Sequence, residues 1–147
     1  MNSRTIIFTN AAKIFLSITG FFFLIKLIGL SHVIELRFLN IVFVLWGINS
    51  AIKTNIQKID TSYIGNLFVG LSTAYIASLA TITAMVIYVT FLDNSLIQML
   101  HDSSFWGNQL TLPQIIFSMV IEATAGCIIS TFILMQYWKS YAVKATT

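Results

Sequence analysis

Four long apolar segments, separated by polar stretches, dominate the hydropathy pattern of the chain. They cover approximately residues 11–30, 36–52, 63–92 and 112–138. About 20 apolar residues in a helix cross the hydrocarbon core of a bilayer. Lipid offers peptide groups no hydrogen-bond partner, so such segments must close their own hydrogen bonds as helices. The pattern predicts an all-α integral membrane four-helix bundle, a single transmembrane domain over residues 1–147.

Polar residues mark the expected helix ends. Thr9 or Asn10 stands where it can cap the first helix. Thr111 can cap the last helix, and Pro113 suits a first turn because its missing N–H has no partner there anyway.

The connections predict how the helices follow one another. Residues 31–35 and 53–62 form short links, which make consecutive helices antiparallel neighbours. Residues 93–111 form the one long link. It is expected to contain a short amphipathic helix at the membrane surface, between the third and fourth spans. The alternative is a cap that covers the outer end of the bundle.

Composition points to lipid as the solvent of this chain. Hydrophobic residues make up 57% of the 147 residues and charged residues 9%, whereas soluble domains carry about 25% charged residues. The mean hydropathy is +0.87. Membrane lipids are therefore the expected surroundings. A nucleic-acid partner is not expected, because the chain has no basic run interleaved with aromatic residues.

The distribution of basic residues predicts the orientation. Cytoplasmic ends of membrane helices carry an excess of Lys and Arg. The link over residues 93–111 contains neither residue, which suits an outer location. We therefore expect a multi-pass protein of the bacterial inner membrane with both termini in the cytoplasm. The basic residues on the expected cytoplasmic side are Arg4, Lys13, Lys53, Lys58, Lys139 and Lys144, against Lys26 and Arg37 on the other.

Glu122 is the most informative candidate for chemistry, because it lies well inside the predicted fourth helix. A carboxylate in that position costs about 2.5 kcal/mol or more on insertion scales, and such residues usually face a bundle interior or a wet cavity. Ser118, Glu122, Gly126 and Ser130 recur every four residues, which favours helix contact. Glu122 is either a proton or cation site or a packing residue that fixes helix register.

Candidate partners of Glu122 follow from depth in the membrane. Asn40, Thr81 and Lys26 fall in the outer halves of the other three predicted helices. We therefore expect these residues to cluster with Glu122, with Asn40 or a threonine nearest to it.

A second stripe of small residues runs along the predicted third helix. Gly70, Ala74 and Ser78 are spaced by four residues. Small side chains at this spacing let helix backbones approach closely in a membrane. The stripe predicts a helix-packing surface.

Cofactor and catalytic motifs are not found in the sequence. Cys127 is the single cysteine, so no internal disulfide or cysteine-based zinc site is expected. His32 and His101 fall in the outer links, where they are expected to be interfacial polar residues instead of facing haem ligands. No metal or cofactor is expected, and enzymatic activity has no positive support in the sequence.

The segments LRFLNIVFVLWGINSAIK, SYIGNLFVGLSTAYIASL, IYVTFLDNSLIQML and IEATAGCIISTFILMQYWK together resemble a known family. It is a domain of unknown function: small four-helix integral membrane proteins common in Bacteroidota. Members have a third helix that contains glycine, an acidic turn such as the one near Asp93, and a last helix with a basic tail. The resemblance implies lineage, topology and an inner-membrane location, but no activity.

Three functions remain open at this point. The first is an accessory or structural subunit that packs against a larger membrane complex or against itself. The second is a small ion- or proton-coupled transporter or channel, a homo-oligomer that uses Glu122. The third is a protein or enzyme that binds lipid or quinone, for which the sequence offers no dedicated residues.

Overall fold

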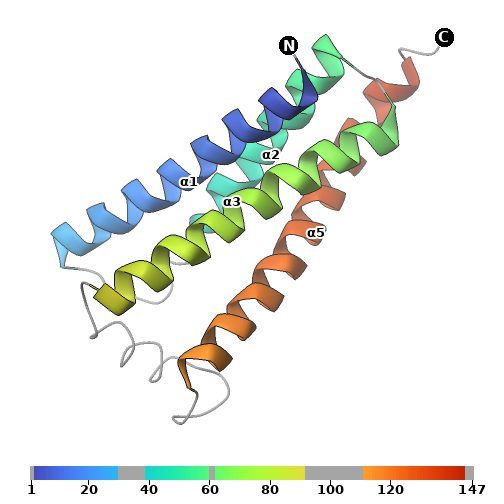
Figure 1. Ribbon diagram of the computed structural model, residues 1–147. Coiled ribbons are helices and arrows are strands. Elements are labelled where there is room, and N and C mark those ends of the chain that lie inside the picture. Colours follow the sequence, from blue (N-terminus) through green and yellow to red (C-terminus); the bar gives the residue numbers. More distant parts are fainter. Residues whose placement is uncertain (1, 30–38, 60–61, 92–110, 145–147) are drawn as a thin grey trace.

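The computed structural model describes residues 2–29, 39–59, 62–91 and 111–144, and these residues form one elongated helical bundle (Figure 1). Successive helices run in opposite directions, so the bundle end where the first helix begins is also the end where the last one finishes (Figure 1). The all-α prediction is confirmed for the described residues. The helices are α1 (Ser3–Ile28), α2 (Leu39–Lys58), α3 (Tyr63–Phe91) and α5 (Leu112–Lys144).

Three of these helices are long and apolar enough to cross a membrane: α1, α3, and the Pro113–Lys139 part of α5. The chain is thus a small helical membrane protein. The fourth described helix, α2, has 20 residues. It is not apolar enough to count as a candidate membrane span, because its second half carries polar residues that include Asn49, Lys53 and Asn55.

The helix ends agree with the sequence patterns in part. α3 and the start of α5 lie within a residue of the predicted positions. Thr111 stands at the predicted N-cap position, because α5 begins directly after it. The side chain of Gln114 folds back there, and its Oε1 accepts hydrogen bonds from the backbone N–H and the Oγ1 of Thr111 at 2.8 and 2.9 Å.

The predicted start of the first helix was wrong. α1 begins at Ser3 and runs through Thr9 and Asn10, which therefore cap nothing. Two preceding residues, Ile6 and Ile7, are buried in a cluster with side chains from α2 and α3, which favours continuing the helix through this stretch. Asn10 is itself buried, and its Nδ2 donates to the carbonyl oxygen of Ile6 at 2.8 Å.

Two helices end later than predicted. α2 continues to Lys58 instead of stopping near residue 52, because Asn55 is buried against α3 and not exposed in a link. α5 continues to Lys144 instead of residue 138. The expected amphipathic helix between the third and fourth spans falls in residues 92–110, outside the described residues, as do His32 and His101.

α2 and α3 each contact the other three described helices. Two glycines allow close approach of neighbouring helices. A Cβ on Gly47 of α2 would clash with the side chain of Ile14 on α1. A Cβ on Gly70 of α3 would lie 2.9 Å from Cγ2 of Thr131 and 3.0 Å from Cδ1 of Ile52. The close packing of the core therefore depends on the absence of a side chain at these two glycines as much as on apolar contacts.

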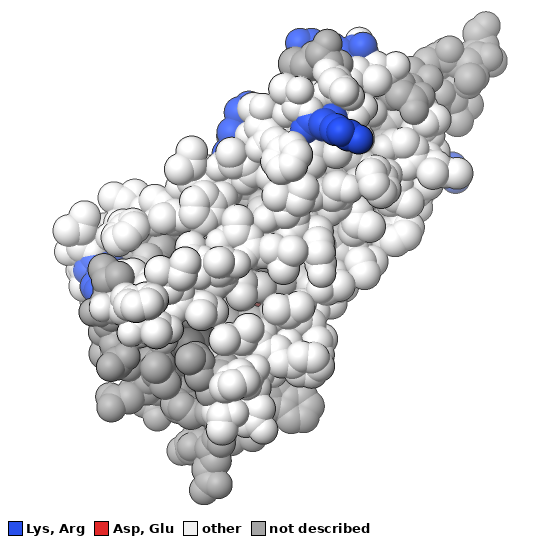
Figure 2. All heavy atoms as spheres, in the orientation of Figure 1, with Lys and Arg blue, Asp and Glu red and all other residues white. Residues whose placement is uncertain are grey.

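Charge separates along the bundle axis. Figure 2 shows basic side chains gathered at the end where α1 begins, and a wide uncharged band beyond them. The helix positions of Arg4, Lys53 and Lys139 place all three at that end, whereas Lys26 lies near the opposite end of α1. The uncharged band is the part of the surface suited to hydrocarbon.

Candidate functional site: the exposed face of α5

Glu122 lies on the exposed side of α5 and not in the interior of the bundle. The expectation of an inward-facing carboxyl is therefore corrected. The buried side of α5 is formed by Cys127, Ser130, Thr131 and Met135, which pack toward α2 and α3. At about 100° per residue, Glu122 projects away from Cys127, Thr131 and Met135. It lies at the margin of the exposed side, because Ile115, seven residues earlier and on nearly the same side, is buried.

The depth of Glu122 makes this position unusual. It is nine residues beyond the start of the Pro113–Lys139 span, about 13 Å along the helix axis. That places it within the hydrocarbon core, and its short side chain cannot reach the headgroups. It is also the only acidic residue in the described part of the chain, and it makes no hydrogen bond or ion pair there. The described residues thus leave this carboxyl exposed and without a polar partner at that depth of the candidate span.

The residues expected to surround Glu122 are engaged elsewhere. Nζ of Lys26 donates to the hydroxyl of Tyr88 on α3 and lies 4.9 Å from the centre of its ring. Oγ1 of Thr81 donates to the carbonyl oxygen of Ala77 in its own helix at 2.9 Å. Asn40 lies on α2, partly exposed. Among the described residues, no hydrogen bond joins any of these three to Glu122.

The small residues of α3 lie where helices meet. Gly70 and Ala74 are buried, and Ala74 belongs to a core cluster that also contains Cys127 of α5. Oγ of Ser78 lies 3.3 Å from Sγ of Cys127. This stripe faces α5 and α2.

The small residues of α5 divide between two sides of the helix. Ser130 is buried, Ser118 is partly buried, and Gly126 is exposed with nothing within 4 Å of an added Cβ. Each four-residue step advances about 40° around a helix, so the sequence stripe winds from one side to the other. The exposed face of α5 is thus defined by Glu122, Ala125, Gly126, Ile129, Phe132 and Ile133.

Side-chain amides tie the helices together in a way that sequence patterns did not reveal; Asn55 and Asn66 are buried and Asn49 is half-buried. Nδ2 of Asn55 on α2 donates to Oδ1 of Asn66 on α3 at 2.9 Å, and Oγ of Ser3 on α1 donates to Oδ1 of Asn55 at 3.3 Å. Nε1 of Trp138 on α5 donates to Oδ1 of Asn49 on α2 at 2.8 Å. The only sign of these hydrogen bonds in the sequence was that each asparagine stands next to apolar residues within a helix.

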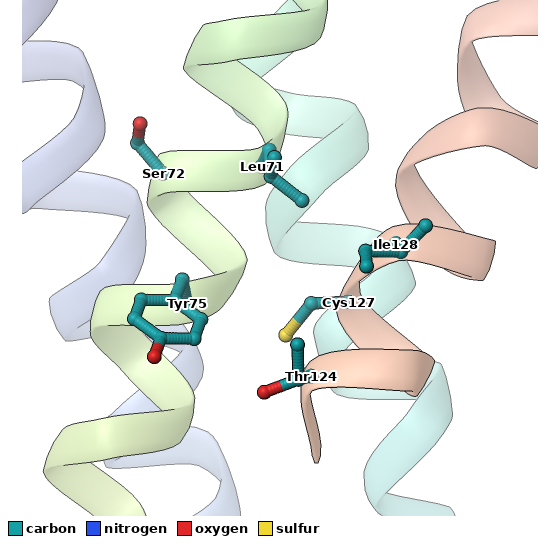
Figure 3. A pocket seen from close by; sticks show the side chains of 6 residues that line it. All are labelled: Leu71, Ser72, Tyr75, Thr124, Cys127 and Ile128. Atoms are coloured by element: carbon teal, nitrogen blue, oxygen red, sulfur yellow. The ribbon is translucent and has the colours of Figure 1, made fainter. Parts of the chain in front are cut away.

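A groove of about 250 Å³ lies between α3 and α5. Figure 3 shows Leu71 from α3 and Cys127 from α5 pointing toward the space between the two helices. Its lining is almost wholly apolar, so a lipid chain or an apolar side chain fits its chemistry better than a polar substrate does. The lining residues are Leu71, Ser72, Tyr75, Thr124, Cys127 and Ile128.

The described residues place no three His, Cys, Asp or Glu side chains together in a group that could hold a metal ion. Comparison of the chain with protein-family models, curated proteins and solved structures finds no match. The geometry of the helical membrane bundle itself is therefore the basis for a functional proposal.

Proposed function

We propose that this chain is an accessory or structural subunit that acts by packing against other membrane-spanning chains, and that the exposed face of α5 is the contact. The observation that carries the proposal is the lipid-exposed carboxyl of Glu122, inside a span and without a partner. A polar group in hydrocarbon is stabilised when a neighbouring helix supplies hydrogen bonds.

The surroundings of Glu122 also favour a helix as its neighbour. Ala125 and Gly126 have little or no side chain, and an added Cβ at Gly126 meets open space. Small residues beside a polar residue allow a second backbone to approach closely enough for hydrogen bonding. Lipid tails alone would leave the carboxyl unsatisfied.

The direct test is purification of the tagged chain in a mild detergent, followed by mass spectrometry of the proteins that accompany it. We expect a larger membrane protein to be recovered in stoichiometric amount. Gly126→Leu should remove it by covering the contact, whereas Gly20→Leu should not. Both glycines are exposed positions within helices, with nothing within 4 Å of an added Cβ. Equal recovery from both variants would contradict the proposed contact.

The second candidate function is a homo-oligomeric ion- or proton-coupled transporter or channel that uses Glu122. The same exposed carboxyl favours it, because a pathway could form where copies meet. In reconstituted vesicles, Glu122→Gln should then abolish flux while assembly stays normal. Unchanged flux, or none in either protein, would leave the accessory role as the better account.

The location proposed with this function is the bacterial inner membrane, with α2 as a fourth span and both termini in the cytoplasm. The gathering of Arg4, Lys53 and Lys139 at one end of the bundle supports this orientation. The resemblance to the four-helix family of Bacteroidota supports the compartment.

A further inference from the structure

Lys13 lies unusually deep in α1 for a charged side chain. It is exposed, ten residues beyond the start of the candidate span Ser3–Ile28, or about 15 Å along the helix axis. Lys26 follows 13 residues later, about 20 Å farther along. Lysines extend their ammonium groups toward the nearest headgroups, so these two together match a hydrocarbon core of about 30 Å. This spacing sets the headgroup layer at the level of Lys13, and the first turns of α1 project beyond it.

Helix rotation places Lys13 beside α2. Ile18 packs in a cluster with Ala77 of α3, and the side chain of Ile14 lies against Gly47 of α2. At about 100° per residue, the direction around α1 passes from Ile18 through Ile14 to Lys13. Lys13 therefore lies on the side of α1 that is next to α2 and away from α3.

Lys53 and Trp46 lie on the outer side of α2. Gly47 of this helix faces α1, and Ile52 lies beside α3. Lys53 and Trp46 are each about 100–120° from Gly47 around the helix, in the direction away from α3. Seven residues separate them, so they point to nearly the same side, and both are exposed. Lys13, Lys53 and Trp46 thus share one outer face of the α1–α2 pair.

The two lysines of this face also lean toward each other along the bundle axis. From the contact between Ile14 and Gly47, Lys53 lies about 8 Å nearer than Lys13 to the end where α1 begins. Helical side chains tilt toward the N-terminus of their own helix, and α1 and α2 are antiparallel. Among the described residues, neither lysine has a hydrogen bond or ion pair, and no acidic residue lies on α1 or α2. Two unneutralised ammonium groups therefore converge on one face.

We propose that Lys13 and Lys53 bind the phosphate of an anionic phospholipid, in the leaflet at this end of the bundle, with Trp46 beneath the headgroup. Basic groups next to a membrane surface attract anionic lipids, and here two of them act on the same headgroup. The inference goes beyond the proposed function, because the site lies on α1 and α2. It leaves the exposed face of α5 free for another chain.

Apolar side chains below the two ammonium groups favour a phospholipid over a free phosphate ion. Trp46 is 53% exposed and Leu16 is 65% exposed, and both lie toward the middle of the bundle from the lysines. An indole suits the boundary between headgroups and acyl chains, and a leucine suits the acyl chains themselves. A zwitterionic lipid carries its own cation, which competes with lysine for the phosphate. Phosphatidylglycerol, which carries a net negative charge, fits the face better.

Quenching of Trp46 by phospholipids brominated in the acyl chains tests the site. Trp106→Phe with Trp138→Phe leaves Trp46 as the sole indole, and circular dichroism establishes that this chain folds. In vesicles of phosphatidylcholine, increasing amounts of brominated phosphatidylglycerol give the relative association constant of the two lipids. We expect phosphatidylglycerol to be preferred by about fivefold or more. Equal association of the two lipids would overturn the proposal.

Single substitutions in the same chain separate the site from the general charge of this end. Lys13→Gln and Lys53→Gln should each lower the preference about fivefold. Lys58→Gln removes the same charge from the same helix, but Lys58 lies about 140° from Lys53 around α2 and should not matter. An equal loss with Lys58→Gln would overturn the site. So would displacement of the lipid by inorganic phosphate at constant ionic strength, which would indicate a free-anion site instead.

Cysteine labelling tests the level of the headgroup layer without the fluorescence assay. In the background Cys127→Ala, Thr9→Cys and Leu16→Cys place exposed thiols seven residues apart on nearly the same side of α1. In membranes opened to both sides, a water-soluble maleimide should label Thr9→Cys and leave Leu16→Cys unlabelled. Equal labelling of the two thiols, or none at either, would mean that the headgroups do not lie at Lys13 and would overturn the proposal.

Discussion

Buried polar side chains differ in whether another helix satisfies them. Asn55 and Asn66 are each 1% exposed and hydrogen-bonded to one another across α2 and α3. Asn10 is 4% exposed, yet its Nδ2 bonds only within α1 and its Oδ1 has no partner. A buried acceptor that loses its donor costs about 1–3 kcal/mol. Burial alone therefore does not decide what an amide contributes.

Asn55→Leu should lower the free energy of unfolding by about 1–3 kcal/mol, because Oδ1 of Asn66 loses this donor inside the bundle. Asn10→Leu, equally buried and similar in volume, should change it much less, because its Oδ1 is already unsatisfied. Reversible unfolding in mixtures of sodium dodecyl sulfate and a mild detergent measures both values.

The double variant Asn55→Leu with Asn66→Leu serves as the control. Replacing both partners leaves no orphaned group between them, so its loss should be smaller than the sum of the two single losses. Additive losses would mean that the hydrogen bond between the two amides contributes nothing.

At the scale of elements, hydropathy predicted the existence and order of the helices, because membrane spans are set by length and apolar content. It placed the start of α1 and the end of α2 wrongly, since Asn10 and Asn55 look like residues at helix ends. Only their burial against other helices shows otherwise. The direction of Glu122 was wrong for a related reason. Small residues lie on both sides of α5, and sequence spacing does not show which side meets α3.

Replacement by alanine should have opposite effects on stability at a glycine in a helix contact and at a glycine with open space around it. Gly47→Ala should destabilise the bundle by about 1–3 kcal/mol, because the added Cβ clashes with Ile14 of α1. Gly20→Ala has open space and should stabilise it by up to about 1 kcal/mol through helix propensity. The same unfolding titration compares them, and a tolerated Gly47→Ala would show that α1 and α2 pack less closely than described.

At the scale of the whole molecule, charge and helix direction agree. α1 begins and α5 ends at one end of the bundle, and most described basic side chains lie there. Positive residues are retained in the cytoplasm during insertion. The same asymmetry predicts that α2 crosses the membrane, since α2 runs from one end of the bundle to the other.

Cysteine labelling from outside intact cells can establish the crossing of α2. In the Cys127→Ala background, Ile28→Cys and Lys58→Cys place exposed thiols near opposite ends of the bundle. A membrane-impermeant maleimide should label Ile28→Cys in intact cells, and Lys58→Cys only after the cells are opened. If both thiols react from the same side, α2 does not cross the membrane and the four-span topology is wrong.

The hydrogen bond from Trp138 to Asn49 gives the molecule an intrinsic optical signal for a single helix contact. The sequence has three tryptophans, so Trp46→Phe with Trp106→Phe leaves Trp138 as the sole indole emitter. Asn49→Leu removes this hydrogen bond to its Nε1 and should move the emission to shorter wavelength. Fluorescence of that chain during unfolding would then report the moment at which α5 leaves α2, separately from the loss of helix seen by circular dichroism.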